Sequence, residues 1–256
     1  MAIEIIGNKE KAVAIIEVRE DEDEKKLVEE ILRKHKNVKC VLKKISERKG
    51  DLRLREYELI AGDDTEVVHK EYGYLLKLDP RKVYFSPREA EERQRIAKQV
   101  FPGEKILVMF SGVAPYAIAI AKKQTQVEKI YCVEKNEKAH EYAKENVRIN
   151  KLSDKIVLIH GNVEEEVEKL RIKFDRIVMP LPFGGKNFLD IAFNCIKNGG
   201  KIHFYSIVED ENYSKILEEI TKIARNFGKE VKILNLRKVS AYAPRKWKVC
   251  VDLEVK

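Results

Sequence analysis

Hydrophobic and polar positions follow a repeating pattern over the second half of the chain, where short apolar runs alternate with longer stretches of helical periodicity. The apolar runs fall near residues 105–109, 129–134, 155–159, 174–179 and 200–206. Strands that alternate with helices form a parallel sheet through right-handed crossovers. Two further strand patterns, at 231–239 and 247–255, are joined by a connection short enough for a hairpin. The sequence therefore predicts an α/β fold with a doubly wound, mostly parallel sheet whose last strand is antiparallel.

The first 80 residues have a different pattern. Residues 12–18 and 38–44 are strand-like and flank a charged amphipathic stretch at 21–35, while the apolar positions at 55–61 and 74–78 indicate further strands of a sheet. These elements predict a small α+β module. Asp79-Pro80-Arg81 separates it from a helix predicted over residues 86–100. We therefore expect two domains, at residues 1–80 and 81–256.

Composition narrows the class of protein. No apolar run approaches the roughly 18 residues that cross a bilayer, and the chain starts Met1-Ala2-Ile3-Glu4 without a signal-like segment, so we expect a cytoplasmic protein with no membrane partner. The 4 cysteines lie mostly inside apolar runs and the 5 histidines are scattered, which indicates buried thiols and no metal site. A net charge of +8 favours a polyanionic partner.

Residues 105–136 carry the strongest functional signal. An apolar strand leads into the turn Phe110-Ser111-Gly112-Val113-Ala114-Pro115, a helix follows, and a second strand ends in Glu134. A small-residue turn followed about 20 residues later by an acid is typical of sites that bind an adenosine cofactor, with the acid on the ribose hydroxyls. The turn contains a single glycine, so the pattern by itself is incomplete.

Ligands of doubly wound sheets bind beyond the carboxyl ends of the strands, so the residues there are the candidate site. The segments at these ends are Phe110-Ser111-Gly112, Glu134-Lys135-Asn136, Gly161-Asn162-Val163 and Pro180-Leu181-Pro182. Each also has a structural reading: Glu134 and Asn162 suit helix caps, and the two prolines suit a stiff turn. A second candidate lies upstream, where Arg88 and Glu92 are four residues apart and would share one helix face. An ordinary surface ion pair is the alternative there.

Taken together these motifs resemble a known family. Tyr84-Phe85-Ser86-Pro87-Arg88 with Glu92-Arg93, Met109-Phe110-Ser111-Gly112-Val113-Ala114-Pro115-Tyr116, Val133-Glu134-Lys135-Asn136, and Leu181-Pro182 with Phe188-Leu189-Asp190 are similar to the archaeal and eukaryotic tRNA guanine-37 N1-methyltransferases. That family has a class I, Rossmann-like S-adenosylmethionine methyltransferase fold with a small module in front. The Pro180-Leu181-Pro182 segment resembles the archaeal subtype associated with wyosine, whose members methylate C7 of a tricyclic guanosine derivative and in some cases also N1 of guanine.

The resemblance implies roles for individual residues. Glu92 would remove the N1 proton of guanine, Arg88 would stabilise charge on O6, and Tyr84 would stack on the base or contact its edge. Arg53 would reach the active site from the front module, with Arg55 as the competing choice. The implied S-adenosylmethionine-binding residues are Phe110, Ser111, Gly112, Val113, Glu134, Lys135, Asn136, Asn162, Val163, Pro180 and Pro182.

Departures from the family leave alternatives open. Val108 replaces an acid, so a contact to the amino-acid part of the cofactor is lost or supplied elsewhere, and Pro180 removes an amide that could bind the base. Related wyosine-pathway enzymes transfer an aminocarboxypropyl group and tend to have Gly-Asn in place of Pro87-Arg88, which favours methyl transfer here. The alternative from a different functional class is a catalytically inactive, RNA-binding relative of these enzymes.

The expected nucleic-acid partner is the anticodon arm of tRNA. The chain begins with what resembles the second module of the family, so the module that grips the tRNA elbow would be absent. The basic residues Arg237, Lys238, Arg245, Lys246 and Lys248, interleaved with Tyr242 and Trp247, are the candidate phosphate-binding group. We expect the protein to act as a monomer.

Overall fold

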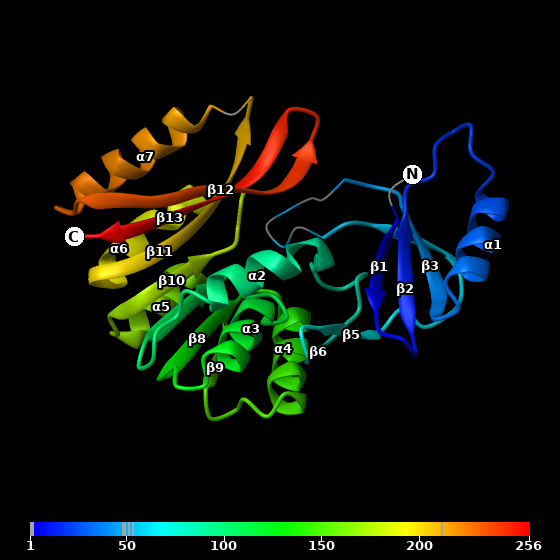
Figure 1. The fold of residues 1–256 in the computed structure, drawn as a ribbon, viewed down its shortest axis with the longest axis horizontal. Coiled ribbons are helices and arrows are strands. Elements are labelled where there is room, and N and C mark those ends of the chain that lie inside the picture. Colours follow the sequence, from blue (N-terminus) through cyan, green and yellow to red (C-terminus); the bar gives the residue numbers. More distant parts are fainter. Residues whose placement is uncertain (1–2, 48–49, 51, 53, 211) are drawn as a thin grey trace.

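The computed structural model describes residues 3–47, 50, 52, 54–210 and 212–256. Its largest element is a seven-stranded sheet with the strand order β12-β13-β11-β10-β7-β8-β9 (Figure 1). The strands are β7 (Lys105–Met109), β8 (Lys129–Glu134), β9 (Ile156–His160), β10 (Phe174–Met179), β11 (Ile196–Glu209), β12 (Val231–Ala243) and β13 (Lys246–Val255). All neighbours from β11 to β9 are parallel, whereas β13 is antiparallel to both β11 and β12. The predicted sheet and its antiparallel last strand are confirmed.

Helices cover both faces of this sheet. The first group is α2 (Ala90–Ala97), preceded by the 3₁₀ turn η1 (Pro87–Glu89), with α3 (Pro115–Lys123) and α4 (Glu137–Ile149). The second group is α5 (Val163–Leu170), η2 (Gly185–Phe188), α6 (Leu189–Cys195) and α7 (Tyr213–Asn226). Strand β7 contributes side chains to both hydrophobic cores. Ile106 and Val108 pack with the first group of helices, and Leu107 and Met109 pack with the second. This two-sided burial explains why β7 reads as an unbroken apolar run.

The N-terminal part of the chain, coloured blue in Figure 1, forms a smaller sheet. It has the order β1-β2-β3-β4 and comprises β1 (Glu4–Gly7), β2 (Ala12–Ile16), β3 (Val38–Lys44) and β4 (Tyr57–Ala61), with α1 (Glu24–Lys34) between β2 and β3. Asp23 caps α1 by accepting hydrogen bonds from the backbone N–H groups of Lys25 and Lys26. The α+β character of this part agrees with the sequence pattern.

The hairpin of β5 (Val67–Glu71) and β6 (Tyr74–Leu78) differs from the sequence expectation, because β6 pairs with β5 rather than with the small sheet. Helix α4 satisfies the outer edge of β6. The side-chain amide of Asn146 accepts from the N–H of Lys77 at 2.6 Å and donates to its carbonyl at 3.0 Å, and Asn150 makes the same pair of bonds to Leu75. The hairpin is therefore attached to the large sheet's helical layer.

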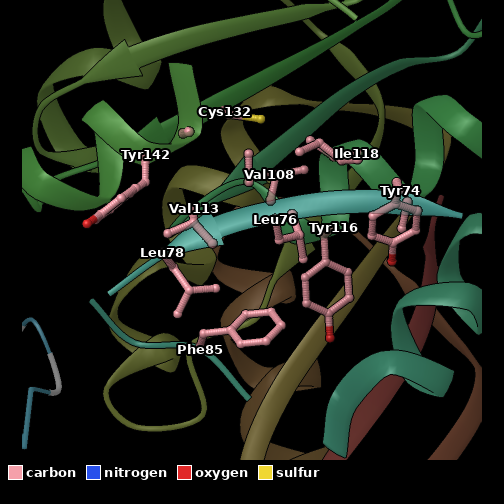
Figure 2. Packing of buried hydrophobic residues seen from close by; sticks show 14 of the residues in the cluster. Tyr74, Leu76, Leu78, Phe85, Val108, Val113, Tyr116, Ile118, Cys132 and Tyr142 are labelled. Atoms are coloured by element: carbon pink, nitrogen blue, oxygen red, sulfur yellow. The ribbon is translucent and has the colours of Figure 1, made fainter. Parts of the chain in front are cut away.

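Figure 2 shows the apolar cluster beneath this hairpin, where Leu76 and Leu78 lie close to Val113. Val108 belongs to the same cluster and is fully buried. All 4 cysteines are buried and unpaired, as predicted. Within the described part of the chain, we find no helix long and apolar enough to cross a membrane.

Candidate active site

Two adjoining cavities lie where the parallel strands end. The smaller measures about 100 Å³ and the larger about 560 Å³, and both are lined by Leu52, Phe110, Glu134 and Leu181. The larger volume is within the range of roughly 300–1,000 Å³ that is usual for small-ligand sites. The predicted location of the site, beyond the carboxyl ends of β7, β8 and β10, is thus hollow in the structure.

The turn after β7 has an unusual backbone. Phe110 and Ala114 adopt left-handed conformations at φ 53° and 65° although neither is glycine, and Gly112 lies between them at φ 55°. The turn is held in place because the N–H of Ser111 donates to the carbonyl of Val133 at 3.0 Å. Sparsely populated backbone conformations of this kind gather at ligand-binding sites.

Glu134 lines both cavities. Its Oε2 accepts the backbone N–H of Gly112 at 2.6 Å, and its Oε1 accepts that of Asn136 at 2.7 Å. Burial raises the pKa of this carboxyl, and the bonds from Asn136 and Gly112 offset part of the rise. The carboxylate is fixed at the turn, with further lone pairs available to the hydroxyls of a ligand.

Two buried hydroxyls of the smaller cavity make no hydrogen bond within the described structure: Ser111 Oγ and Tyr116 Oη. The ring of Tyr205 packs against that of Tyr116, but the Tyr205 hydroxyl donates to Glu92 at 2.6 Å. Buried polar groups are normally paired, so these hydroxyls indicate a place for a polar ligand.

Most of the predicted cofactor-binding residues come together here. The cavity walls contain Phe110, Ser111, Gly112, Glu134, Lys135, Asn136, Asn162, Val163, Pro180 and Pro182. Val113 does not line either cavity, because its side chain is fully buried in the cluster beneath β6 (Figure 2). Asn162 stands at the N-cap of α5 but makes no side-chain capping bond.

The structure does not place Arg88 and Glu92 in one pocket. Arg88 lies in the 3₁₀ turn η1 and is exposed, whereas Glu92 lies in α2 and is 3% exposed. Arg95 donates to both carboxylate oxygens of Glu92, at 2.7 and 2.8 Å. Neither Arg88 nor Glu92 lines the smaller cavity. The two side chains are separated because Arg88 is exposed to solvent while Arg95 holds Glu92 in the interior.

Glu89 and Arg93, the neighbouring pair with the same spacing, line the cavity instead. Glu89 Oε1 accepts from Lys248 Nζ at 2.7 Å and from the Tyr84 hydroxyl at 3.2 Å. Arg93 forms a two-bonded ion pair with Glu71, one bond measuring 2.8 Å. Burial acts to raise the pKa of Glu89, but the charge and hydrogen bond of Lys248, together with Arg93 and Tyr84, outweigh it and lower the pKa. Glu89 is therefore an anion at the cavity wall.

Behind α2, a buried network fixes Glu92 in place. Arg95 also binds Asp252, which accepts from His203 Nδ1 at 2.6 Å, and Arg176 lies 2.7 Å from His203 Nε2. His203, Cys250 and Asp252 have ligand atoms within 4.8 Å of one another. The two arginines already supply the positive charge in that cluster, which disfavours a metal cation there.

Residues of the front module and of the basic group were also predicted to contribute to the site. Arg53 lies outside the described residues, and the competing Arg55 donates to Glu47 at 3.2 Å, away from the two cavities. Lys248, predicted to bind phosphate, is instead buried against Glu89. Tyr242 is 46% exposed and packs edge-on against Phe183 at the rim of the larger cavity.

Comparison with known proteins identifies the family. A model described as the TRM5/TYW2 methyltransferase domain matches residues 67–234, and one described as the TYW2 N-terminal domain matches residues 4–65. The chain belongs to the Trm5/TYW2 family. Enzymes of this family depend on S-adenosylmethionine.

Its relatives within the Trm5/TYW2 family carry out different reactions. The tRNA (guanine(37)-N(1))-methyltransferase Trm5b of Pyrococcus abyssi is 40% identical, over 99% of this chain and 74% of that protein. The tRNA(Phe) (4-demethylwyosine(37)-C(7)) aminocarboxypropyltransferase of Methanocaldococcus jannaschii is 32% identical, over 94% of each chain. The tRNA (guanine(37)-N(1))/4-demethylwyosine(37)-methyltransferase Taw22 of Nanoarchaeum equitans is 30% identical, over 99% of each.

Solved structures of the family include complexes with ligands. A complex of aTrm5 with tRNALeu superposes with a TM-score of 0.85 at 34% identity, covering 100% of this chain and 72% of that one. Pyrococcus horikoshii TYW2 in complex with MeSAdo superposes with a TM-score of 0.84 at 30% identity, covering 99% and 90%. The fixed carboxylate of Glu134 and the unpaired hydroxyls of Ser111 and Tyr116 fit a ligand that carries a ribose and a polar amino-acid end.

Proposed function

We propose that this Trm5/TYW2 protein transfers a methyl group from S-adenosylmethionine to nucleotide 37 of tRNA, at N1 of guanosine and/or C7 of a wyosine precursor. The carrying observation is the pair of joined cavities at the strand ends. Glu134 lines both, and the smaller cavity also holds the two unpaired hydroxyls together with Tyr84 and Glu89. A cofactor region and an acceptor region meet there.

The cofactor region has a group for each part of S-adenosylmethionine. Glu134 would accept from the ribose hydroxyls, and Phe110, Val163 and Phe188 would supply apolar contacts to the adenine. Ser111 and Tyr116 would bind the amino-acid end, a role that Val108 cannot fill from within the core. When bound, the cofactor supplies a methyl group already activated by its sulfonium.

The acceptor region suits a flat base. Pro180 and Pro182 present apolar surfaces without N–H donors, and the half-buried Tyr84 offers a ring for stacking. Methylation at N1 of guanine also needs an acceptor for the N1 proton. Glu92, which the family resemblance assigns to that role, would first have to release one of its bonds from Arg95 or Tyr205.

The proposed RNA partner is the anticodon arm. The exposed Phe183 and Tyr242 rim the larger cavity, where unstacked bases beside nucleotide 37 could lie against them. Lys246 on β13, which lines a further hollow together with Phe183 and Tyr242, adds positive charge near this rim. Because one chain forms both cavities, the proposal needs no second subunit, and light scattering would test monomeric behaviour.

Methyl transfer is tested with unmodified tRNA transcripts and S-adenosylmethionine labelled either in the methyl group or in the carboxyl carbon. We expect methyl label alone to reach the RNA, and mass spectrometry of nuclease digests to place it on nucleotide 37. A tRNA carrying the wyosine precursor, tested in parallel, separates N1 from C7 transfer. Absence of label on both RNAs would contradict the proposal and favour an inactive RNA-binding relative.

Aminocarboxypropyl transfer is the second candidate. It is favoured by the match of residues 4–65 to the TYW2 N-terminal domain and by the end-to-end similarity to the M. jannaschii aminocarboxypropyltransferase. The segment Pro87-Arg88 argues against it, because the resemblance associates Gly-Asn with that reaction. Carboxyl label in the RNA, with the methyl label left on the cofactor product, would establish this alternative.

A further inference from the structure

Glu89 is a carboxylate in the acceptor region to which the proposed function assigns no chemical role. It is 5% exposed, yet it forms part of the wall of the smaller cavity beside Tyr84 and Pro180. An ionised carboxylate is costly to bury unless it is paired, and Lys248 from β13 provides the pair. Lys248 is itself held 4.9 Å from the centre of the Tyr205 ring. The ion pair of Glu89 and Lys248 is thus a fixed part of the cavity wall.

The two oxygens of Glu89 differ in their bonding. Oε1 accepts from Lys248 and from Tyr84, while Oε2 accepts no hydrogen bond from any residue the structure describes. The nearby charged or titratable groups are Lys248, Arg93, Tyr84 and Tyr116. Arg93 is committed to Glu71 and to the carbonyl of Ser86, 3.1 Å away. Oε2 therefore remains the acceptor that a ligand can use.

Other groups of the cavity leave this role to Glu89. Glu134, the other carboxylate among the described lining residues, faces the cofactor turn through Gly112 and Asn136. Pro180 and Pro182 have no backbone N–H to donate, so they provide contact area in this cavity rather than polar recognition. An anionic acceptor beside stacking surfaces selects a base whose edge presents donors.

Building on the proposed function, we infer that Glu89 is a specificity-determining residue that accepts a hydrogen bond from the 2-amino group of guanine, with Lys248 as its positioning partner. Guanine carries this donor at C2, whereas adenine has only a hydrogen atom at that position and offers a carboxylate no N–H donor there. The tricyclic wyosine precursor has used the 2-amino nitrogen in its third ring. Glu89 therefore favours guanosine over that precursor.

The role of Glu89 is tested with a double-mutant cycle, in which one change is made in the protein and the other in the base of the RNA. Wild type and Glu89→Gln are assayed with anticodon stem-loops carrying guanosine or inosine at position 37, since inosine lacks only the 2-amino group. A hydrogen bond to a charged group is typically worth a factor of about ten to a hundred. We expect inosine to weaken wild-type equilibrium binding and single-turnover rate by about that factor, and to have an effect below about threefold in Glu89→Gln.

Controls separate recognition from folding. Glu91→Gln, an exposed neighbour on α2, should keep the wild-type preference for guanosine. Glu89→Asp keeps the charge and should retain part of the preference even if the loss of side-chain length lowers stability. Thermal unfolding and binding of S-adenosylhomocysteine are measured for every variant.

Three results would overturn the inference. Equal guanosine-to-inosine ratios in wild type and Glu89→Gln would show that Glu89 does not read the base edge, while leaving the methyltransferase function intact. A tenfold or larger loss of cofactor affinity in Glu89→Gln, with the base preference kept, would place the carboxylate at the cofactor. Absence of transfer by wild type to any tRNA would remove the proposed function and this role with it.

Discussion

Replacing Asn146 with leucine removes the side-chain amide that ties the β5–β6 hairpin to the cofactor turn. Asn146 is fully buried and makes three hydrogen bonds: one from the N–H of Lys77, one to the carbonyl of Lys77 and one to the carbonyl of Val113. Leucine has a similar branched shape, although it is larger, and it leaves all three backbone groups unpaired. Each unpaired buried group costs about 1–3 kcal/mol, and the added apolar contact offsets part of the sum. We expect a loss of about 3–5 kcal/mol.

The assay is unfolding followed by two probes. The single tryptophan, Trp247, reports on β13 of the large sheet, and far-ultraviolet circular dichroism reports on the whole chain. Coincident transitions justify a two-state free energy. For a chain of this size the expected loss lowers Tm by roughly 6–20 °C, at about 2–4 °C per kcal/mol. The control Asn194→Leu, at an exposed position of α6, should stay within about 0.5 kcal/mol. A change of less than about 1 kcal/mol in Asn146→Leu would refute the reasoning.

Three further predictions concern the cofactor, the RNA and the buried network. Because burial raises the pKa of Glu134, the affinity for S-adenosylhomocysteine should fall on acidification at a higher pH than an ordinary glutamate would cause. In calorimetry, Glu134→Gln should bind this ligand about tenfold more weakly at neutral pH and show little pH dependence. If the variant kept the pH dependence of the wild type, Glu134 would be excluded as its source. Tyr242→Ala should weaken tRNA binding by about fivefold or more in filter assays if a base stacks on this ring, whereas Tyr72→Ala, on the exposed β5–β6 turn, should not. Burial lowers the pKa of His203 despite the opposing effect of Asp252, so the unfolded chain binds a proton at this histidine before the folded chain does. The free energy of unfolding should therefore decline as the pH falls below about 6.5. His203→Gln should reduce the dependence of Tm on pH, and an undiminished dependence would argue against His203 as its cause.

Strands that are buried on both faces were predictable from the sequence alone. The predicted limits of β7, β8 and β10 coincide with those in the structure, because a parallel strand between two helical layers is an uninterrupted apolar run. The sequence did not reveal β5 or the separate β5–β6 hairpin. Its edge is satisfied by the amides of Asn146 and Asn150, roughly seventy residues away, and no local pattern encodes such bonds.

The candidate site shows the same division. The turn at Gly112 and the acid at Glu134 were predictable, since parallel strands bring their carboxyl ends to one edge whatever the details of packing. The unpaired hydroxyls of Ser111 and Tyr116 were not, because an unpaired group is defined only by the atoms around it. Residue types near the strand ends are thus a property of the sequence, and their pairing is a property of the packed structure.

The choice between two pairs of charged residues was decided by tertiary structure. Arg88 and Glu92 are four residues apart, and so are Glu89 and Arg93, so sequence spacing supports either pair equally. Advancing one residue along a helix turns the side chain by about 100°, which is enough to move it from a cavity wall to another face. The sequence determined only that this segment carries acids and arginines at helical spacing. The turn η1 and the packing of α2 determined that Glu89 and Arg93, rather than Arg88 and Glu92, face the cavity.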